Sequence, residues 1–136
     1  MVNVIEACLI RTPASKGGVD HYFVRLTLSD LLGYHTFYRI FEKTQNGIQW
    51  RNEYADNPAA DILSTVTDWR QINEVSERLK IAQTWTDYYL LASNCEHFAR
   101  YVIEGVSRSS QVMNGAFLAL GGLALAGIVL RDSKRL

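Results

Sequence analysis

The strongest constraint on this chain is a run of nineteen residues without a charged side chain, residues 112–130. A helix of about 20 apolar residues is long enough to cross the hydrocarbon core of a bilayer. Arg131, Lys134 and Arg135 follow the run and give it a basic end. The pattern predicts a C-terminal hydrophobic membrane helix in an anchor of residues 111–136, and it leaves residues 1–110 for one further domain.

Small residues recur along this expected helix at steps of three and four. They would line one face, which a second helix could approach closely. The residues are Gly115, Ala119, Gly122 and Ala126. This arrangement favours self-association through the C-terminal helix. The alternative, a helix buried inside the globular fold, is weaker because nearly every side of the segment is apolar or small.

The composition limits the partners and the compartment. Lys plus Arg and Asp plus Glu each number 14, so no excess of positive charge favours nucleic acid as a partner. Cys8 and Cys95 are too few for a disulfide framework and have no zinc spacing, so we expect a reducing compartment and no metal. Residues 1–10 lack a basic segment and include Glu6, which argues against a signal peptide. We expect a cytosolic domain, tail-anchored on an intracellular membrane. The basic end would itself favour a cytosolic C-terminus, so the topology of the tail stays open.

The first half of the chain is rich in β-branched and aromatic residues in alternating patterns, which predict antiparallel strands. Asn46-Gly47 is a strong signal for a tight turn between two strands. Residues 52–61 have few strand-forming residues and are expected to be a loop. The expected strands are residues 3–11, 21–27, 34–41 and 48–51.

Two helices are expected after these strands, so the predicted fold class is α+β, with an antiparallel sheet packed on helices. The first begins at residue 67 or 68 and buries one face. That face is formed by Ile72, Val75, Leu79 and Ala82. The second runs from about Cys95 to Gly105, a residue type that often ends a helix.

Cys95 lies in the first turn of the second expected helix. Ser93 and Glu96 fit a capping box with Ser93 as the N-cap residue. The positive end of a helix dipole stabilises a thiolate, which makes Cys95 the candidate nucleophile. The structural alternative is a small thiol that packs inward, because free cysteine is among the most buried residue types.

Two histidines on neighbouring expected strands, His21 and His35, are candidates for the base and for the group that orients it. Taken singly, each is equally consistent with a half-buried polar residue on a strand. A turn centred near Ser29 would make them close neighbours on one face, and a turn centred on Leu31 would separate them. A two-residue turn at Ser29 and Asp30 would place them on opposite faces.

The segment Asn94-Cys95-Glu96-His97-Phe98, followed by residues 105–112 and a hydrophobic tail with a basic end, resembles the lecithin:retinol acyltransferase family. Within it, the best match is the H-Ras-like suppressor group of phospholipase A/acyltransferases. The resemblance implies a circularly permuted NlpC/papain-like fold, with Cys95 as nucleophile, His21 as base and His35 as the orienting residue. The chain departs from the family pattern in the hairpin, which has two extra residues between the histidines and Leu31-Leu32-Gly33 in place of a tight turn.

The resemblance also implies a function, that of a membrane-anchored, cysteine-dependent phospholipase A1/2 and N-acyltransferase. Cys95 would form an acyl thioester with a glycerophospholipid, then release fatty acid to water or transfer the acyl group to the amine of phosphatidylethanolamine. The partners would be a phospholipid substrate and the membrane, and no cofactor or metal is required. Two alternatives stay open: a cysteine amidase or peptidase, and a membrane-anchored interaction protein whose catalytic site has decayed.

Overall fold

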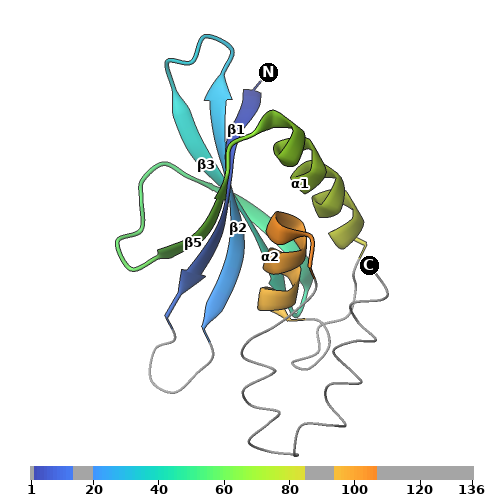
Figure 1. Ribbon diagram of the computed structural model, residues 1–136. Coiled ribbons are helices and arrows are strands. Elements are labelled where there is room, and N and C mark those ends of the chain that lie inside the picture. The colour runs from blue at the N-terminus through green and yellow to red at the C-terminus, as the bar shows by residue number, and fades with distance from the viewer. Residues whose placement is uncertain (1, 14–19, 85–93, 107–136) are drawn as a thin grey trace, which may run out of the picture.

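A five-stranded antiparallel sheet forms the larger part of the structure, a computed structural model that describes residues 2–13, 20–84 and 94–106 (Figure 1). The strands lie in the order β4-β3-β2-β1-β5, and two helices follow β5 in the chain. The strands are β1 (Val2–Thr12), β2 (His21–Asp30), β3 (Thr36–Thr44), β4 (Gly47–Glu53) and β5 (Asp61–Val66). The helices are α1 (Trp69–Ala82) and α2 (Cys95–Glu104). The α+β class predicted from the sequence is therefore confirmed.

Both helices pack on the same face of the sheet (Figure 1). On β2, alternate side chains face the helices, as the period of a strand requires. Tyr22, Val24, Leu26 and Leu28 lie in one buried cluster with residues of both helices, among them Val75, Leu79, Phe98 and Val102. This cluster is the main core, and it fixes α2 against the sheet.

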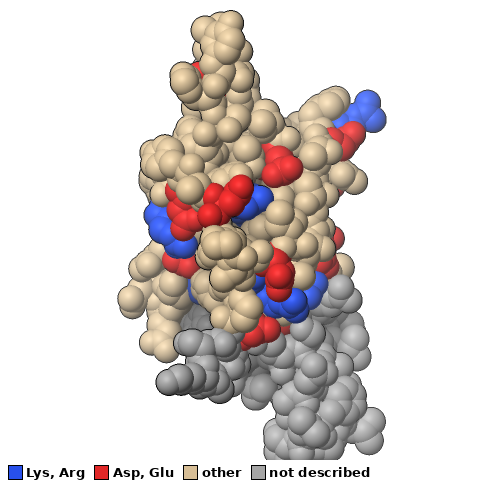
Figure 2. All heavy atoms as spheres, turned by 90° about the vertical axis from the view of Figure 1, so that its left-hand side faces the viewer, with Lys and Arg blue, Asp and Glu red and all other residues tan. Residues whose placement is uncertain are grey.

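The opposite face of the sheet carries a smaller apolar cluster formed by Cys8, Ile10, Phe23 and Ile40. Cys8 is fully buried there. Figure 2 shows acidic and basic side chains next to one another on this side of the molecule. The ion pairs of Arg25 with Glu6 and Asp56, and of Arg51 with Glu42 and Glu53, join neighbouring segments.

The predicted helix face of α1 is confirmed, because its four buried residues are Ile72, Val75, Leu79 and Ala82. Asp68 caps this helix by accepting hydrogen bonds from the backbone N–H groups of Arg70 and Gln71. From α1, Arg78 donates to the backbone carbonyls of Val102 and Ile103 near the end of α2. These bonds satisfy carbonyls that a helix end leaves without intrahelical donors. They also hold α2 in place.

The N-cap of α2 differs from the prediction. Asn94, and not Ser93, occupies this position, and its Oδ1 accepts a hydrogen bond of 2.9 Å from the backbone N–H of His97. Asparagine is as good an N-cap residue as serine, so the helix begins one residue later than the capping-box pattern indicated. Gly105 ends the helix in the left-handed conformation, φ 76°, as expected.

Residues 111–136, which carry the predicted membrane anchor and its stripe of small residues, lie outside the described residues. Within the ranges that the structure does describe, neither helix has the length and apolar content needed to cross a membrane.

Candidate active site

Cys95 is the first residue of α2, and the cap at Asn94 fixes the orientation of this helical turn. Its thiol donates a hydrogen bond of 3.8 Å to the backbone carbonyl of Asp20, the residue before β2. Its side chain is buried. Three residues further on, the fully buried side chain of Phe98 anchors the helix in the core. The N–H groups in the first turn have no intrahelical acceptor, so the backbone N–H of Cys95 is suited to bind a developing oxyanion.

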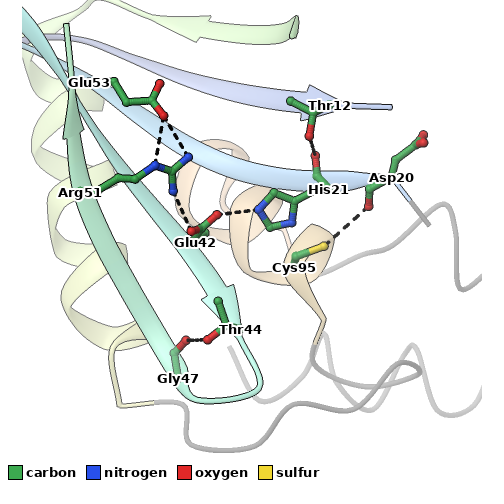
Figure 3. A network of polar contacts seen from close by, with 9 residues as sticks. All are labelled: Thr12, Asp20, His21, Glu42, Thr44, Gly47, Arg51, Glu53 and Cys95. Atoms are coloured by element: carbon green, nitrogen blue, oxygen red, sulfur yellow. Dashed lines mark hydrogen bonds and ion pairs between the residues drawn. The ribbon is translucent and has the colours of Figure 1, made fainter. Parts of the chain in front are cut away.

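His21 opens β2, and its ring lies between the thiol of Cys95 and the carboxylate of Glu42 (Figure 3). Nε2 of His21 is 2.7 Å from Oε2 of Glu42. The second ring nitrogen lies on the side of the Cys95 thiol (Figure 3), and Cys95 is close enough to raise the pKa of the ring. When Glu42 is ionised it accepts the Nε2–H proton, which leaves Nδ1 of a neutral imidazole as the acceptor. His21 therefore lies where a base could take the thiol proton, and its role as the base stays a prediction.

Glu42 is the residue that the sequence reading missed. In the pairing of β2 with β3, Val24 lies opposite Phe41. Continuing that register by one pair places Glu42 opposite Phe23, which makes it the diagonal neighbour of His21 on the same face. The sequence does hold one indication of this position. Glu42 directly follows the apolar pair Ile40-Phe41 and is two residues from Ile40, so it lies on the same strand face as Ile40. That pattern alone also fits an ordinary solvent-facing residue.

The structure does not bring His35 to His21. The chain turns over residues 31–34, and Asp30 donates its backbone N–H to the carbonyl of His35. His35 is thus at the tip of the β2–β3 hairpin, whereas His21 is at the opposite end of β2, nine residues before Asp30. At about 3.3 Å per residue the separation is roughly 30 Å. The expectation that His35 orients His21 is therefore wrong in its geometry, because the turn is centred beyond Leu31.

His97, the remaining histidine, supports the helix start. Its backbone N–H bonds to the cap at Asn94, and its side chain is 1% exposed. His97 therefore packs in the interior at the start of the helix. The described ranges contain no group of three or more His, Cys, Asp or Glu side chains arranged to hold a metal ion.

The surroundings of His21 raise the pKa of its imidazole above the ordinary value. The largest cause is the hydrogen bond with Cys95, and the hydrogen bond with Glu42 adds to it, while burial opposes both. Because the folded pKa is raised, the protonated ring stabilises the fold fully below the unfolded pKa of about 6.5. This contribution is lost as the pH rises through the folded pKa.

A titration of the His21 ring tests this environment. In the full chain in detergent micelles, the NMR shifts of the ring should titrate with a midpoint above about 6.5. Cys95→Ala should lower the midpoint because it removes the largest raising contact, and Glu42→Gln should lower it by removing the second. A midpoint at or below about 6.5 in the unmodified chain would contradict the arrangement.

Three side chains from three elements therefore lie next to one another (Figure 3): a thiol at a helix start, an imidazole, and a carboxylate that the imidazole contacts. This order, nucleophile to base to orienting acid, is the arrangement that activates a nucleophile for covalent catalysis. Comparison of the chain with models of known protein families, with curated proteins and with solved structures finds no match.

Proposed function

We propose that this chain is a thiol-dependent acyltransferase and phospholipase A that acts on glycerophospholipids through an acyl thioester on Cys95. The observation that carries the proposal is the position of the His21 ring between the Cys95 thiol and the Glu42 carboxylate, which it contacts at 2.7 Å (Figure 3). The Asn-Cys-Glu-His-Phe segment and its resemblance to the lecithin:retinol acyltransferase family supply the substrate class. A thiol at a helix start, packed on an antiparallel sheet that carries the base, is also consistent with the circularly permuted NlpC/papain-like fold.

In the first half of the reaction, Nδ1 of His21 takes the proton of the Cys95 thiol as sulfur attacks the ester carbonyl carbon. The carbonyl oxygen becomes an oxyanion, which the backbone N–H of Cys95 stabilises. When the carbon–oxygen ester bond breaks, His21 returns the proton to the departing lysophospholipid alkoxide. Glu42 holds the ring and stabilises its positive charge between the two transfers.

In the second half, His21 removes a proton from the acceptor that attacks the thioester, and the sulfur leaves as the thiol. Water as acceptor gives a free fatty acid, and the amine of phosphatidylethanolamine gives an N-acyl phospholipid. The anchor proposed for residues 111–136 would keep the site beside a substrate that stays in the bilayer and so raise its effective concentration. We place the protein on an intracellular membrane with residues 1–110 in the cytosol.

The same three side chains would also serve a cysteine amidase or peptidase, because proton transfer and thioester formation do not depend on the leaving group. The alternative of an interaction protein with a decayed catalytic site is weaker, because the thiol, the imidazole and the carboxylate still lie next to one another (Figure 3). The hairpin that departs from the family pattern turns far from Cys95.

The substrate class is tested by offering the full chain two kinds of substrate. Phosphatidylcholine vesicles, with and without phosphatidylethanolamine, are expected to yield fatty acid or N-acyl lipid and a covalent acyl adduct visible by intact mass. A mixed peptide and amide library should not be cleaved. Cleavage of the library without any lipid product would move the assignment to the amidase, and no product from either substrate would favour the decayed protein.

A further inference from the structure

The two carboxylate oxygens of Glu42 are divided between two partners (Figure 3). Oε2 is 2.7 Å from Nε2 of His21, and Oε1 accepts a hydrogen bond of 2.7 Å from Nη1 of Arg51. Arg51 is in turn held by Glu53, whose Oε1 accepts from Nε at 3.0 Å and lies 3.0 Å from Nη2. The guanidinium therefore lies between two carboxylates, of which only Glu42 contacts His21.

The strand register brings these groups to one face. On the β3–β4 ribbon, Glu42 pairs with Gln49 and Ile40 pairs with Arg51. Arg51 is thus the diagonal neighbour of Glu42, and Glu53 follows Arg51 by two residues on the same side. The network runs across the strands from β2 to β4 and ends at the edge of the sheet.

A carboxylate turns easily about its last torsion, which has a broad energy profile. A single bond to His21 would leave that rotation open, and the Glu42 side chain retains 20% of its exposure, so water can compete for it. A second, charge-assisted bond at the other oxygen fixes the plane of the carboxylate, because the guanidinium presents its donors in a rigid fork. Glu53 in turn fixes the guanidinium of Arg51.

We infer that Arg51 is a positioning residue of the active site, which fixes Glu42 in the orientation that holds His21 against the thiol of Cys95. The inference rests on the proposed thiol chemistry but goes beyond it, because Arg51 touches neither His21 nor the nucleophile. If Arg51 had only a structural role, it would contribute as an exposed ion pair, because 47% of its side chain is exposed. Such pairs contribute little to stability.

Two effects of removing Arg51 on the pKa of His21 have opposite signs. Loss of a nearby positive charge would by itself raise the pKa. Without Arg51, Glu42 would no longer be held in a fixed orientation, and its hydrogen bond with His21 would weaken. That bond raises the pKa of His21, so its weakening lowers the pKa. Besides Glu42, the described groups next to His21 include Cys95 of α2, the Phe23 ring on β2 with its centroid 5.7 Å away and, on the backbone carbonyl of His21, the Thr12 hydroxyl of β1. None of these three groups changes in an Arg51 variant, so the direction of the shift separates the two effects.

The test compares Arg51→Met, Arg51→Lys and Arg39→Met in the full chain in detergent micelles. Arg39 is the matched control, because it bonds across the same two strands to Asn52, 3.0 Å away, and stacks on Trp50 without touching Glu42. Each variant is measured for kcat and KM on a short-chain phosphatidylcholine and for the NMR titration of His21. Thermal unfolding is measured alongside.

Arg51→Met should lower kcat by about tenfold to a hundredfold with KM unchanged, the size expected for a misplaced catalytic group. The midpoint of the His21 titration should fall, and thermal stability should drop no further than in Arg39→Met. Arg51→Lys should recover part of kcat, because it keeps one charged donor for Glu42. An unchanged or raised midpoint, or an unchanged kcat, would overturn the inference. If the unmodified chain turns over no substrate, the proposed function fails, and the titration alone decides the role of Arg51.

Discussion

Replacement of Cys95 by serine is expected to abolish acyl transfer and the acyl adduct while leaving the fold intact. The hydroxyl is nearly the same size as the thiol and can donate to the carbonyl of Asp20 in the same way. A serine hydroxyl is, however, a much weaker nucleophile than a cysteine thiol near neutral pH. Loss of the attacking group from a triad typically removes most of the rate enhancement, so we expect a fall of about 10⁴-fold or more in kcat.

The measurement is fatty acid release from phosphatidylcholine vesicles, together with intact mass after a short incubation. Cys8→Ala is the control, because Cys8 is the other cysteine of the chain and lies on the face of the sheet away from the helices. It should retain both the adduct and turnover. An adduct that persists in Cys95→Ser and disappears in Cys8→Ala would reassign the nucleophile.

Substitution of the two strand histidines should have very unequal effects. His21→Gln keeps a polar side chain at the end of β2 but cannot accept and return a proton, so kcat should fall by about 10²- to 10⁴-fold. His35→Gln alters a residue at the far end of the hairpin, where the backbone carbonyl makes the contact with Asp30. Its turnover should stay within about twofold of the unmodified chain, because surface substitutions away from a site rarely matter.

The ratio of the two effects decides between the arrangement expected from the family resemblance and the one found in the structure. Both variants are assayed on the same vesicles, with circular dichroism as a check on folding. Equal losses in folded proteins would restore His35 to the site and remove the reason for assigning the orienting role to Glu42.

The contrast between His35 and Glu42 shows where reasoning from the sequence succeeds and where it stops. Local patterns predicted the strand that begins at His21, the buried face of α1 and, to within one residue, the start of α2. The identity of the orienting residue depends on the register of a hairpin, and the register depends on where the chain turns. The sequence around Leu31 has no tight-turn pair, so several turn positions were consistent with it.

The strand β5 was missed for a related reason. Its residues pair at the edge of the sheet with β1, and most of them remain exposed, so they show no clear alternation of apolar and polar side chains. Whether this segment forms a strand depends more on its pairing with β1, far away in the sequence, than on its own composition. The same holds for Arg51, whose contact with Glu42 follows from the pairing of β3 with β4.

The hydrogen bond between Cys95 and the carbonyl of Asp20 joins residues 75 apart in the chain. Contacts of such separation have a high loop-closure cost and belong to the slow part of folding. A nascent chain that has made its hairpins, but has not yet docked α2, carries the thiol without its base. In the proposed mechanism, acyl transfer would therefore require that α2, the last described helix, has docked on the sheet.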